Sequence, residues 1–205
     1  MKINTILPNG KWYDNGEGID ISSILTLRNI NRFFNFNFTN KLNVLEHSFI
    51  CAILVPKYCD YMAEKYDEFK ETFNDVNYRF MLIQALLSHD LEEIVIGDIP
   101  APVKFDGLDE IKLDIREKFR KYIGFNVNEK SNAIISGMKH IDNIAVFIEL
   151  YMYNCRVKNM MDYYVKKIEK YKLDGFIQKL DGDLFGYYLK CANGDYFNEV
   201  EENKS

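Results

Sequence analysis

The chain has 205 residues, of which 47% are hydrophobic and 28% are charged. This composition suffices for one globular domain with its own core, and it excludes disordered and fibrous proteins. The net charge of −5 is small and the basic residues form no stripe, so we expect no nucleic acid polymer as a partner.

The first residues and the cysteines of the chain bear on its cellular location. The first residues, MKINTILPNGKWYDNG, lack the charged-then-apolar order of a signal peptide. No stretch approaches the roughly 20 apolar residues that a membrane helix needs. Four cysteines show no CxxC spacing, and we expect reduced, packed thiols rather than a structural zinc site: Cys51, Cys59, Cys155 and Cys191. These features predict a soluble, cytoplasmic protein without a membrane partner.

Residues 1–19 are predicted to be an N-terminal extension. Thr5–Trp12 is expected to form a short β-hairpin, because Asn-Gly between extended segments favours a tight turn. After the extension, Asp20 or Ser22 is expected to cap a helix that runs to about Phe34.

Two arginines lie four residues apart on this first predicted helix, Arg28 and Arg32. We interpret Arg28 as part of a solvated face. Arg32 is a candidate site residue, because an aromatic pair follows it directly and the next loop leads to a potential metal ligand.

The segment from Val44 to about Lys65 has the apolar pattern of a helix, which Pro56 is expected to kink or split. It contains His47, one of three histidines in the chain. A histidine on an apolar helix face is usually a hydrogen-bonded core residue, but it is also a potential metal ligand. From this segment alone, both interpretations of His47 remain open.

The next helix is expected to pass through the middle of the domain, since almost every residue of Phe80–Leu87 is apolar. It ends in His89 and Asp90, which are ligand types for a divalent transition metal. Glu93 follows His89 by four residues, and a continuing helix would place its carboxylate on the same face. There it would lie near enough to handle the proton of a metal-bound water.

A stiff loop follows, in which Gly97 and two prolines are expected to end the helix and turn the chain. This loop would hold Asp98 and Lys104 near the same helix end. Beyond it, Leu108–Tyr122 is predicted to be a peripheral amphipathic helix whose charges form a solvated face without a chemical role.

A second long apolar helix is predicted from about Glu129 to Arg156. It contains Asp142 within an apolar run, where an unpaired carboxylate is costly and a metal would pair it. His140 competes for this role, but an offset of two residues puts it on roughly the opposite side of the helix. We expect one of the two to be a ligand, and the apolar neighbours favour Asp142.

The remaining helical segments are expected to close an all-α bundle. Residues 20–195 would then form one domain, and residues 196–205 an acidic tail.

These candidates stand in the order His47, His89-Asp90 and Asp142, and the chain resembles the HD-domain metal-dependent phosphohydrolases, whose signature is H…HD…D on a helical bundle. It is similar to the branch of 5'-deoxynucleotidases and viral dNTP triphosphohydrolases over residues 10–151. The shared motifs are Arg-aromatic, E-H-S and the specific block HD-x-x-E…G-D-x-P-x-P-x-K. They occur here as Arg32-Phe33, Glu46-His47-Ser48, His89–Glu93 and Gly97–Lys104.

The resemblance implies a role for each matching residue. Four of them would bind one divalent ion: His47, His89, Asp90 and Asp142. These ligands suit Co, Mn, Fe or Zn, with Mg as a further option. Glu93 and Asp98 would do the proton work. Arg32 would bind the phosphate, with Lys104 as a weaker candidate. The family's aromatic residue after that arginine is a Trp, and Phe33 here implies a relaxed preference for deoxyribose.

The resemblance thus implies hydrolysis of a small nucleotide, with dNMP going to deoxynucleoside and phosphate. Two alternatives remain. The N-terminal stretch is similar to viral members, which implies release of triphosphate from a dNTP. A non-catalytic nucleotide-binding module is the other alternative, although such a module would not need both Glu93 and Asp98. The family also implies a homo-oligomer.

Overall fold

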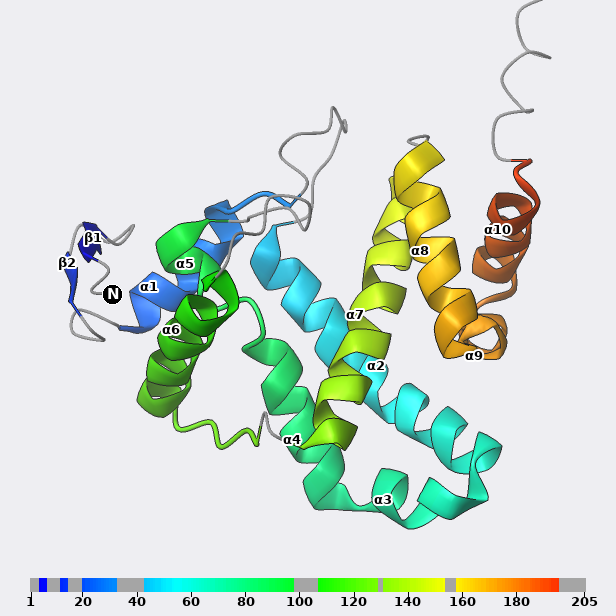
Figure 1. The fold of residues 1–205 in the computed structure, drawn as a ribbon, viewed down its shortest axis with the longest axis horizontal. Helices are drawn as coiled ribbons and strands as arrows, with labels where there is room; N and C mark the ends of the chain where they lie inside the picture. Colours follow the sequence, from blue (N-terminus) through cyan, green and yellow to red (C-terminus); the bar gives the residue numbers. More distant parts are fainter. Residues whose placement is uncertain are drawn as a thin grey trace, which may run out of the picture.

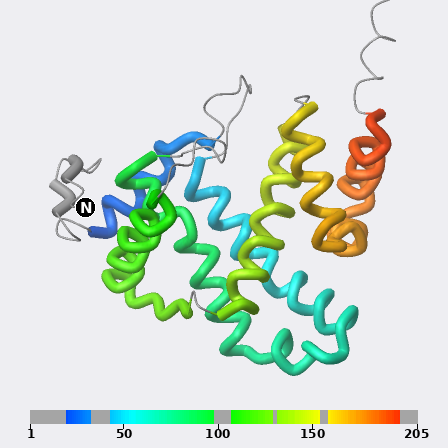
Figure 2. Tube along the Cα trace, viewed as in Figure 1, coloured from blue at the N-terminus to red at the C-terminus, as the bar shows by residue number. Residues whose placement is uncertain are grey.

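The computed structural model describes residues 4–6, 12–14, 20–32, 43–97, 107–128, 131–153 and 158–195. It is an all-α bundle, as the sequence predicts (Figure 1). The first helices lie at one end of the molecule and α10 (Gly182–Asn193) lies at the other, as the trace in Figure 2 also shows.

Helix α2 (Val44–Lys65) lies at the centre of the bundle (Figure 1). Asn43 begins it with a capping box, in which its side chain accepts from the Glu46 backbone N–H and the Glu46 carboxylate accepts from the Asn43 N–H. The helix continues through the exposed Pro56, so the expected split does not occur. Around it pack α3 (Lys70–Asn74), α4 (Val76–Leu87) and α7 (Asn132–Met152).

The main hydrophobic core lies between α2, α4, α7 and the C-terminal helices. Those helices are α8 (Lys158–Tyr171), α9 (Asp174–Leu180) and α10. Large side chains fill this core completely, among them Tyr58, Phe147 and Phe176. At Gly137, α7 approaches α4 so closely that an added Cβ would lie 3.0 Å from the Tyr78 hydroxyl. The core therefore fixes the two helices that carry or precede the predicted ligands.

A smaller core lies at the N-terminal end of the bundle. It joins α1 (Ile21–Leu25), the 3-10 helix η1 (Thr26–Asn29), α5 (Glu93–Ile96) and α6 (Leu108–Ile123). Its buried members are Leu27, Val44, Leu91, Ile94, Ile115 and Phe119. This core holds α5 and α6 beside the beginning of α2.

Several predicted boundaries are wrong. Asp20 caps the first helix as expected, but the helical stretch ends at Asn29, so Arg32 lies in the following turn. Helix α4 begins at Val76, and Phe80 is 59% exposed, so this helix does have a solvent-facing side.

The N-terminal hairpin is confirmed in its two strands, β1 (Asn4–Ile6) and β2 (Trp12–Asp14). They pair antiparallel with Thr5 opposite Tyr13. Within the described residues, no helix is both long enough and apolar enough to cross a membrane.

Candidate metal centre

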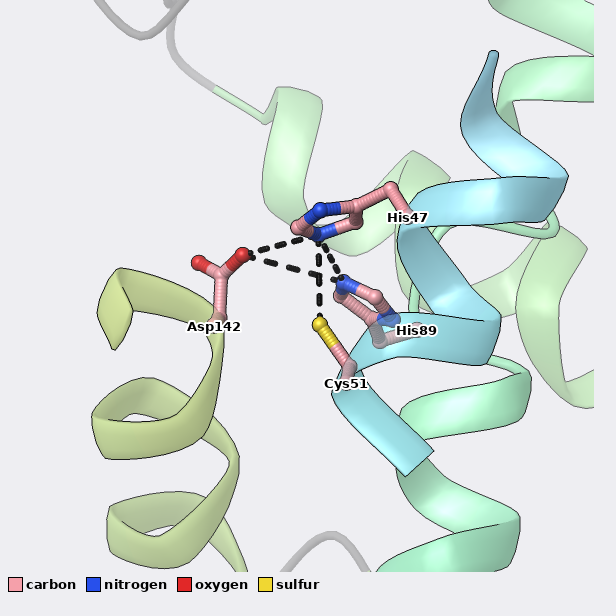
Figure 3. A group of neighbouring side chains, drawn as sticks. All are labelled: His47, Cys51, His89 and Asp142. Carbon is pink, nitrogen blue, oxygen red and sulfur yellow. Dashed lines mark hydrogen bonds and ion pairs between the residues drawn. The ribbon is translucent and has the colours of Figure 1, made fainter. Parts of the chain in front are cut away.

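Three separate parts of the chain bring metal-binding side chains to one point (Figure 3). His47 and Cys51 come from α2, His89 from the turn after α4, and Asp142 from α7. One donor atom from each of the four residues lies within 4.8 Å of the other three. The predicted ligands His47, His89 and Asp142 therefore lie together.

The distances within this cluster centre on the Nε2 atom of His47. It lies 3.1 Å from Asp142 Oδ1, 3.3 Å from His89 Nε2 and 3.4 Å from Cys51 Sγ. His47 is fully buried and His89 is 8% exposed. The Asp142 side chain is 39% exposed, so the cluster meets solvent on that side.

Hydrogen bonds fix the orientation of both imidazoles. His89 Nδ1–H donates to the Leu86 carbonyl at 2.6 Å, and His47 Nδ1–H donates to the Glu149 carboxylate. With Nδ1 as the donor in each of these hydrogen bonds, Nε2 is the atom that each imidazole turns towards the cluster. Second partners of this kind are what orient histidines that bind metals.

This donor set fits a divalent cation. The two Nε2 atoms lie 3.3 Å apart, and a carboxylate oxygen and a sulfur lie beside them. A cation bound between them would take the place of the proton that His47 shares with Asp142 and would contact all four donor atoms. Imidazole, carboxylate and thiolate are the ligands that Zn²⁺ and similar ions take in proteins.

Asp90 lies at the edge of the cluster and connects it to Arg32. Its Oδ2 is 3.2 Å from His89 Nε2 and 3.2 Å from Arg32 Nη1. Arg32 Nε in turn lies 3.4 Å from Glu149 Oε2. The predicted phosphate-binding guanidinium is thus located beside the predicted metal ligands.

Charge and burial shift the pKa values of this network. Burial and Arg32 lower the pKa of His47, but Cys51, Glu149 and Asp142 outweigh them and raise it well above its usual value. Burial alone would raise the pKa of Asp142, yet its hydrogen bond to His47 and the nearby positive groups lower it. Asp142 is therefore a carboxylate at neutral pH, as a ligand must be.

Arg32 is held in its charged form by carboxylates. Burial disfavours its charge, but Glu149, Asp90, Asp142 and Glu93 together raise its pKa above the usual value. Glu93 is 4% exposed, so a predicted proton-transfer residue is buried within the electrostatic reach of Arg32.

The backbone between His89 and Glu93 differs from the expected helix. Helix α4 ends at Leu87, residues 88–92 form turns, and Glu93 begins α5. The expected continuing helix is therefore wrong, although Glu93 lies one short segment from His89. Gly97 then ends α5 with a φ of +74°, a backbone conformation that residues other than glycine rarely adopt.

Helix α6 is more than the solvated helix that its charges predict. Arg116 forms two hydrogen bonds, of 2.9 and 2.6 Å, with Glu92, whose side chain is 1% exposed. Arg120 is buried and donates to Ser88 Oγ at 2.6 Å. Both arginines thereby hold the turn that carries His89 and Asp90.

The two potential metal ligands on α7, His140 and Asp142, have different surroundings. Asp142 joins the cluster, whereas His140 accepts a hydrogen bond of 2.8 Å from the Tyr58 hydroxyl. Burial lowers the pKa of His140 to about 4, so it is a neutral core histidine.

Some predicted residues lie outside the described residues, namely Phe33, Asp98 and Lys104. Sequence reasoning in turn missed Cys51, Glu149 and Tyr164. Cys51 follows His47 by four residues and Glu149 follows Asp142 by seven, which are spacings that share a helix face. Tyr164 of α8 lies near the cluster, since burial and Asp142 raise its pKa.

Comparisons with known proteins agree with this geometry. A family model described as 5'-deoxynucleotidase YfbR-like matches residues 21–112. No curated protein matches the chain at a significant level. Among solved structures, the chain resembles the cyanophage S-2L HD phosphohydrolase (DatZ) bound to dA and one catalytic Zn²⁺ ion.

That structural likeness has a TM-score of 0.51 at 16% sequence identity, and it covers 90% of this chain and 98% of that chain. At this identity the likeness shows a shared fold. The chain thus has the fold of an HD phosphohydrolase, and over residues 21–112 its sequence is similar to the 5'-deoxynucleotidase YfbR-like family, which indicates a hydrolase.

Proposed function

We propose that the chain hydrolyses the phosphoester of a 5'-deoxynucleoside monophosphate to give deoxynucleoside and phosphate. The observation that carries this proposal is the convergence of His47, His89 and Asp142 beside Arg32. The matching family model, 5'-deoxynucleotidase YfbR-like, covers the segment that supplies both histidines and Arg32.

The residues that would hold a divalent ion are His47, His89, Asp90 and Asp142. Such an ion supplies Lewis acidity, which makes water a stronger nucleophile at neutral pH and offsets negative charge on phosphate oxygens. The exposed side of Asp142 gives water and substrate a way in.

Arg32 would bind the phosphate of the substrate. Its charge is fixed, and its fork of N–H donors matches two phosphate oxygens. Attack on phosphorus builds negative charge on the equatorial oxygens, and a guanidinium held beside the metal ligands would stabilise that charge. The contacts to Asp90 and Glu149 keep the guanidinium in place.

Glu93 would take the proton of the attacking water, because it is a buried carboxylate whose charge acts on Arg32 beside the predicted metal ligands. Asp98 would return a proton to the leaving sugar oxygen, and Lys104 would add positive charge. These three roles follow from the family motif that contains them.

Release of triphosphate from a dNTP is a second candidate. The N-terminal segment ILPNGKWYD is similar to that of viral family members, and dA in the neighbouring structure is a deoxynucleoside, the product that either reaction releases. A third possibility, nucleotide binding without turnover, is disfavoured by the presence of both Glu93 and Asp98, since a binding module would need neither for proton transfer.

A substrate panel separates the three. Purified protein would be incubated with nucleoside and deoxynucleoside mono- and triphosphates, each with Co²⁺, Mn²⁺ or Mg²⁺. We expect inorganic phosphate from deoxynucleoside monophosphates. Inorganic triphosphate from dNTPs would favour the second candidate. Nucleotide binding without any product would show the binding module.

A further inference from the structure

We propose that Cys51 is a further ligand to the divalent ion, so that a thiolate binds it together with the histidines and aspartates. This rests on the proposed metal-dependent function. The H…HD…D motif contains no cysteine, and Cys51 belongs to none of the sequence motifs that the chain shares with HD-domain phosphohydrolases.

Helix geometry places Cys51 next to the first histidine. It follows His47 by four residues on α2, which is one helical turn along the same face. Both side chains are fully buried. The Cys51 sulfur lies 3.4 Å from His47 Nε2, the nitrogen that faces the cluster.

The distances between donors match those around a small cation. With bonds of about 2.0–2.1 Å to nitrogen or oxygen and about 2.3 Å to sulfur, tetrahedral donors lie about 3.3–3.6 Å apart. The corresponding separations here are 3.1, 3.3 and 3.4 Å from His47 Nε2, and 3.9 Å between His89 Nε2 and Asp142 Oδ1. The remaining two separations, from Cys51 Sγ to the donor atoms of His89 and Asp142, lie within 4.8 Å.

Asp90 lies at the edge of this group, and its Oδ2 also contacts Arg32 at 3.2 Å. Among the described residues, the group of mutually close donors contains Cys51 and not Asp90.

A sulfur ligand has a chemical consequence. Thiolates are soft ligands that select Zn²⁺ and similar ions, whereas Mg²⁺ and Mn²⁺ prefer oxygen. On binding, the Cys51 thiol loses its proton to solvent and the sulfur coordinates as thiolate. The site is therefore expected to favour Zn²⁺ or Co²⁺ over Mg²⁺.

The test uses Co²⁺ and Zn²⁺ added to metal-free full-length protein. Wild type with Co²⁺ should show a thiolate-to-cobalt charge-transfer band in the near ultraviolet, and X-ray absorption of the Zn²⁺ form should show a sulfur at about 2.3 Å. Cys51→Val should abolish both signals and weaken Zn²⁺ binding by at least about 10-fold.

Cys59→Val is the matched control, because Cys59 is an equally buried thiol on the same helix, outside the donor group. It should keep both signals. Should Cys51→Val fail to fold, Cys51→Ser serves instead, since it keeps a polar group but removes the sulfur.

Metal-loaded wild type without the band and without a sulfur neighbour would overturn the proposal and leave Cys51 as a hydrogen-bond partner of His47. These signals are read without substrate. A failure of nucleotide hydrolysis with the band present would therefore count against the proposed function alone.

Discussion

At the scale of single residues, the proposed role of Glu93 in proton transfer can be tested by substitution. Glu93→Gln removes the proton acceptor but keeps the size of a buried side chain that is 4% exposed. We expect kcat to fall by about 10²-fold or more, because positioned proton transfer contributes about that much. The measurement is steady-state hydrolysis at saturating Co²⁺.

Metal binding by Glu93→Gln serves as its control and should match wild type. Full turnover in this variant would show that another group takes the proton.

Glu149 is predicted to be a positioning residue, since it accepts the Nδ1 proton of His47 and pairs with Arg32. Glu149→Gln should weaken Co²⁺ binding by about 10–100-fold, the usual effect of losing such a partner. It should also raise KM, because Arg32 loses one of its anchors. Metal titration and steady-state kinetics measure the two effects.

Glu117→Gln on the exposed face of α6 is the matched change of charge and should alter neither quantity. Unchanged metal affinity in Glu149→Gln would show that His47 keeps its orientation without the carboxylate.

The sequence indicates those site residues whose charged side chains are costly to bury without a partner. Asp142 in an apolar run had to be paired, and His140 on the other side of the helix did not qualify. Glu149 obeys the same rule, and its burial could have been expected from the surrounding apolar residues. Cys51 gave no such signal, because a thiol packs in a core without any partner.

At the scale of secondary-structure elements, α6 stabilises the turn that carries His89. Arg116→Met leaves the buried Glu92 carboxylate with Lys112 at 3.7 Å. We expect the free energy of unfolding to fall by about 3 kcal/mol, as is typical when one partner of a buried ion pair is removed. Urea denaturation measures it.

Lys118→Met on the same helix is the comparison, since its pair with Asp114 is exposed. That change should stay within about 0.5 kcal/mol of wild type. Equal effects of both substitutions would show that α6 does not clamp the turn.

The turn of residues 88–92 could not be predicted from the sequence. The residues after Leu87 keep a helical pattern, so a continuing helix was the natural expectation. The turn is held instead by Arg116 and Arg120, which come from α6 and are distant in sequence. The bundle itself was predictable, because its apolar periodicity is local.

At the scale of the whole molecule, buried acids predict loss of stability at high pH. Burial raises the pKa of Cys59 from 9.0 to about 12, and burial also raises the pKa of Tyr58. Above pH 9 the unfolded chain loses the thiol proton and the folded chain keeps it, so unfolding becomes easier as pH rises towards 12.

This loss should be measurable as a slope in the free energy of unfolding. Between about pH 9 and about pH 10.5 it should approach about 1.4 kcal/mol per pH unit for Cys59, and Tyr58, whose ordinary pKa is 10.0, adds its share only above about pH 10. Cys59→Val should have a shallower slope than wild type, with Tyr58 supplying part of the remainder. Identical slopes in wild type and Cys59→Val would show that the Cys59 thiol does not cause the loss of stability.

The most direct test of the central claim is hydrolysis of a deoxynucleoside monophosphate by metal-stripped protein as Co²⁺ is added in steps. We predict no activity without metal, a linear rise to a plateau at about one ion per chain, and no such rise in Asp142→Asn. Full activity in the stripped protein, or an unchanged plateau in Asp142→Asn, would contradict it.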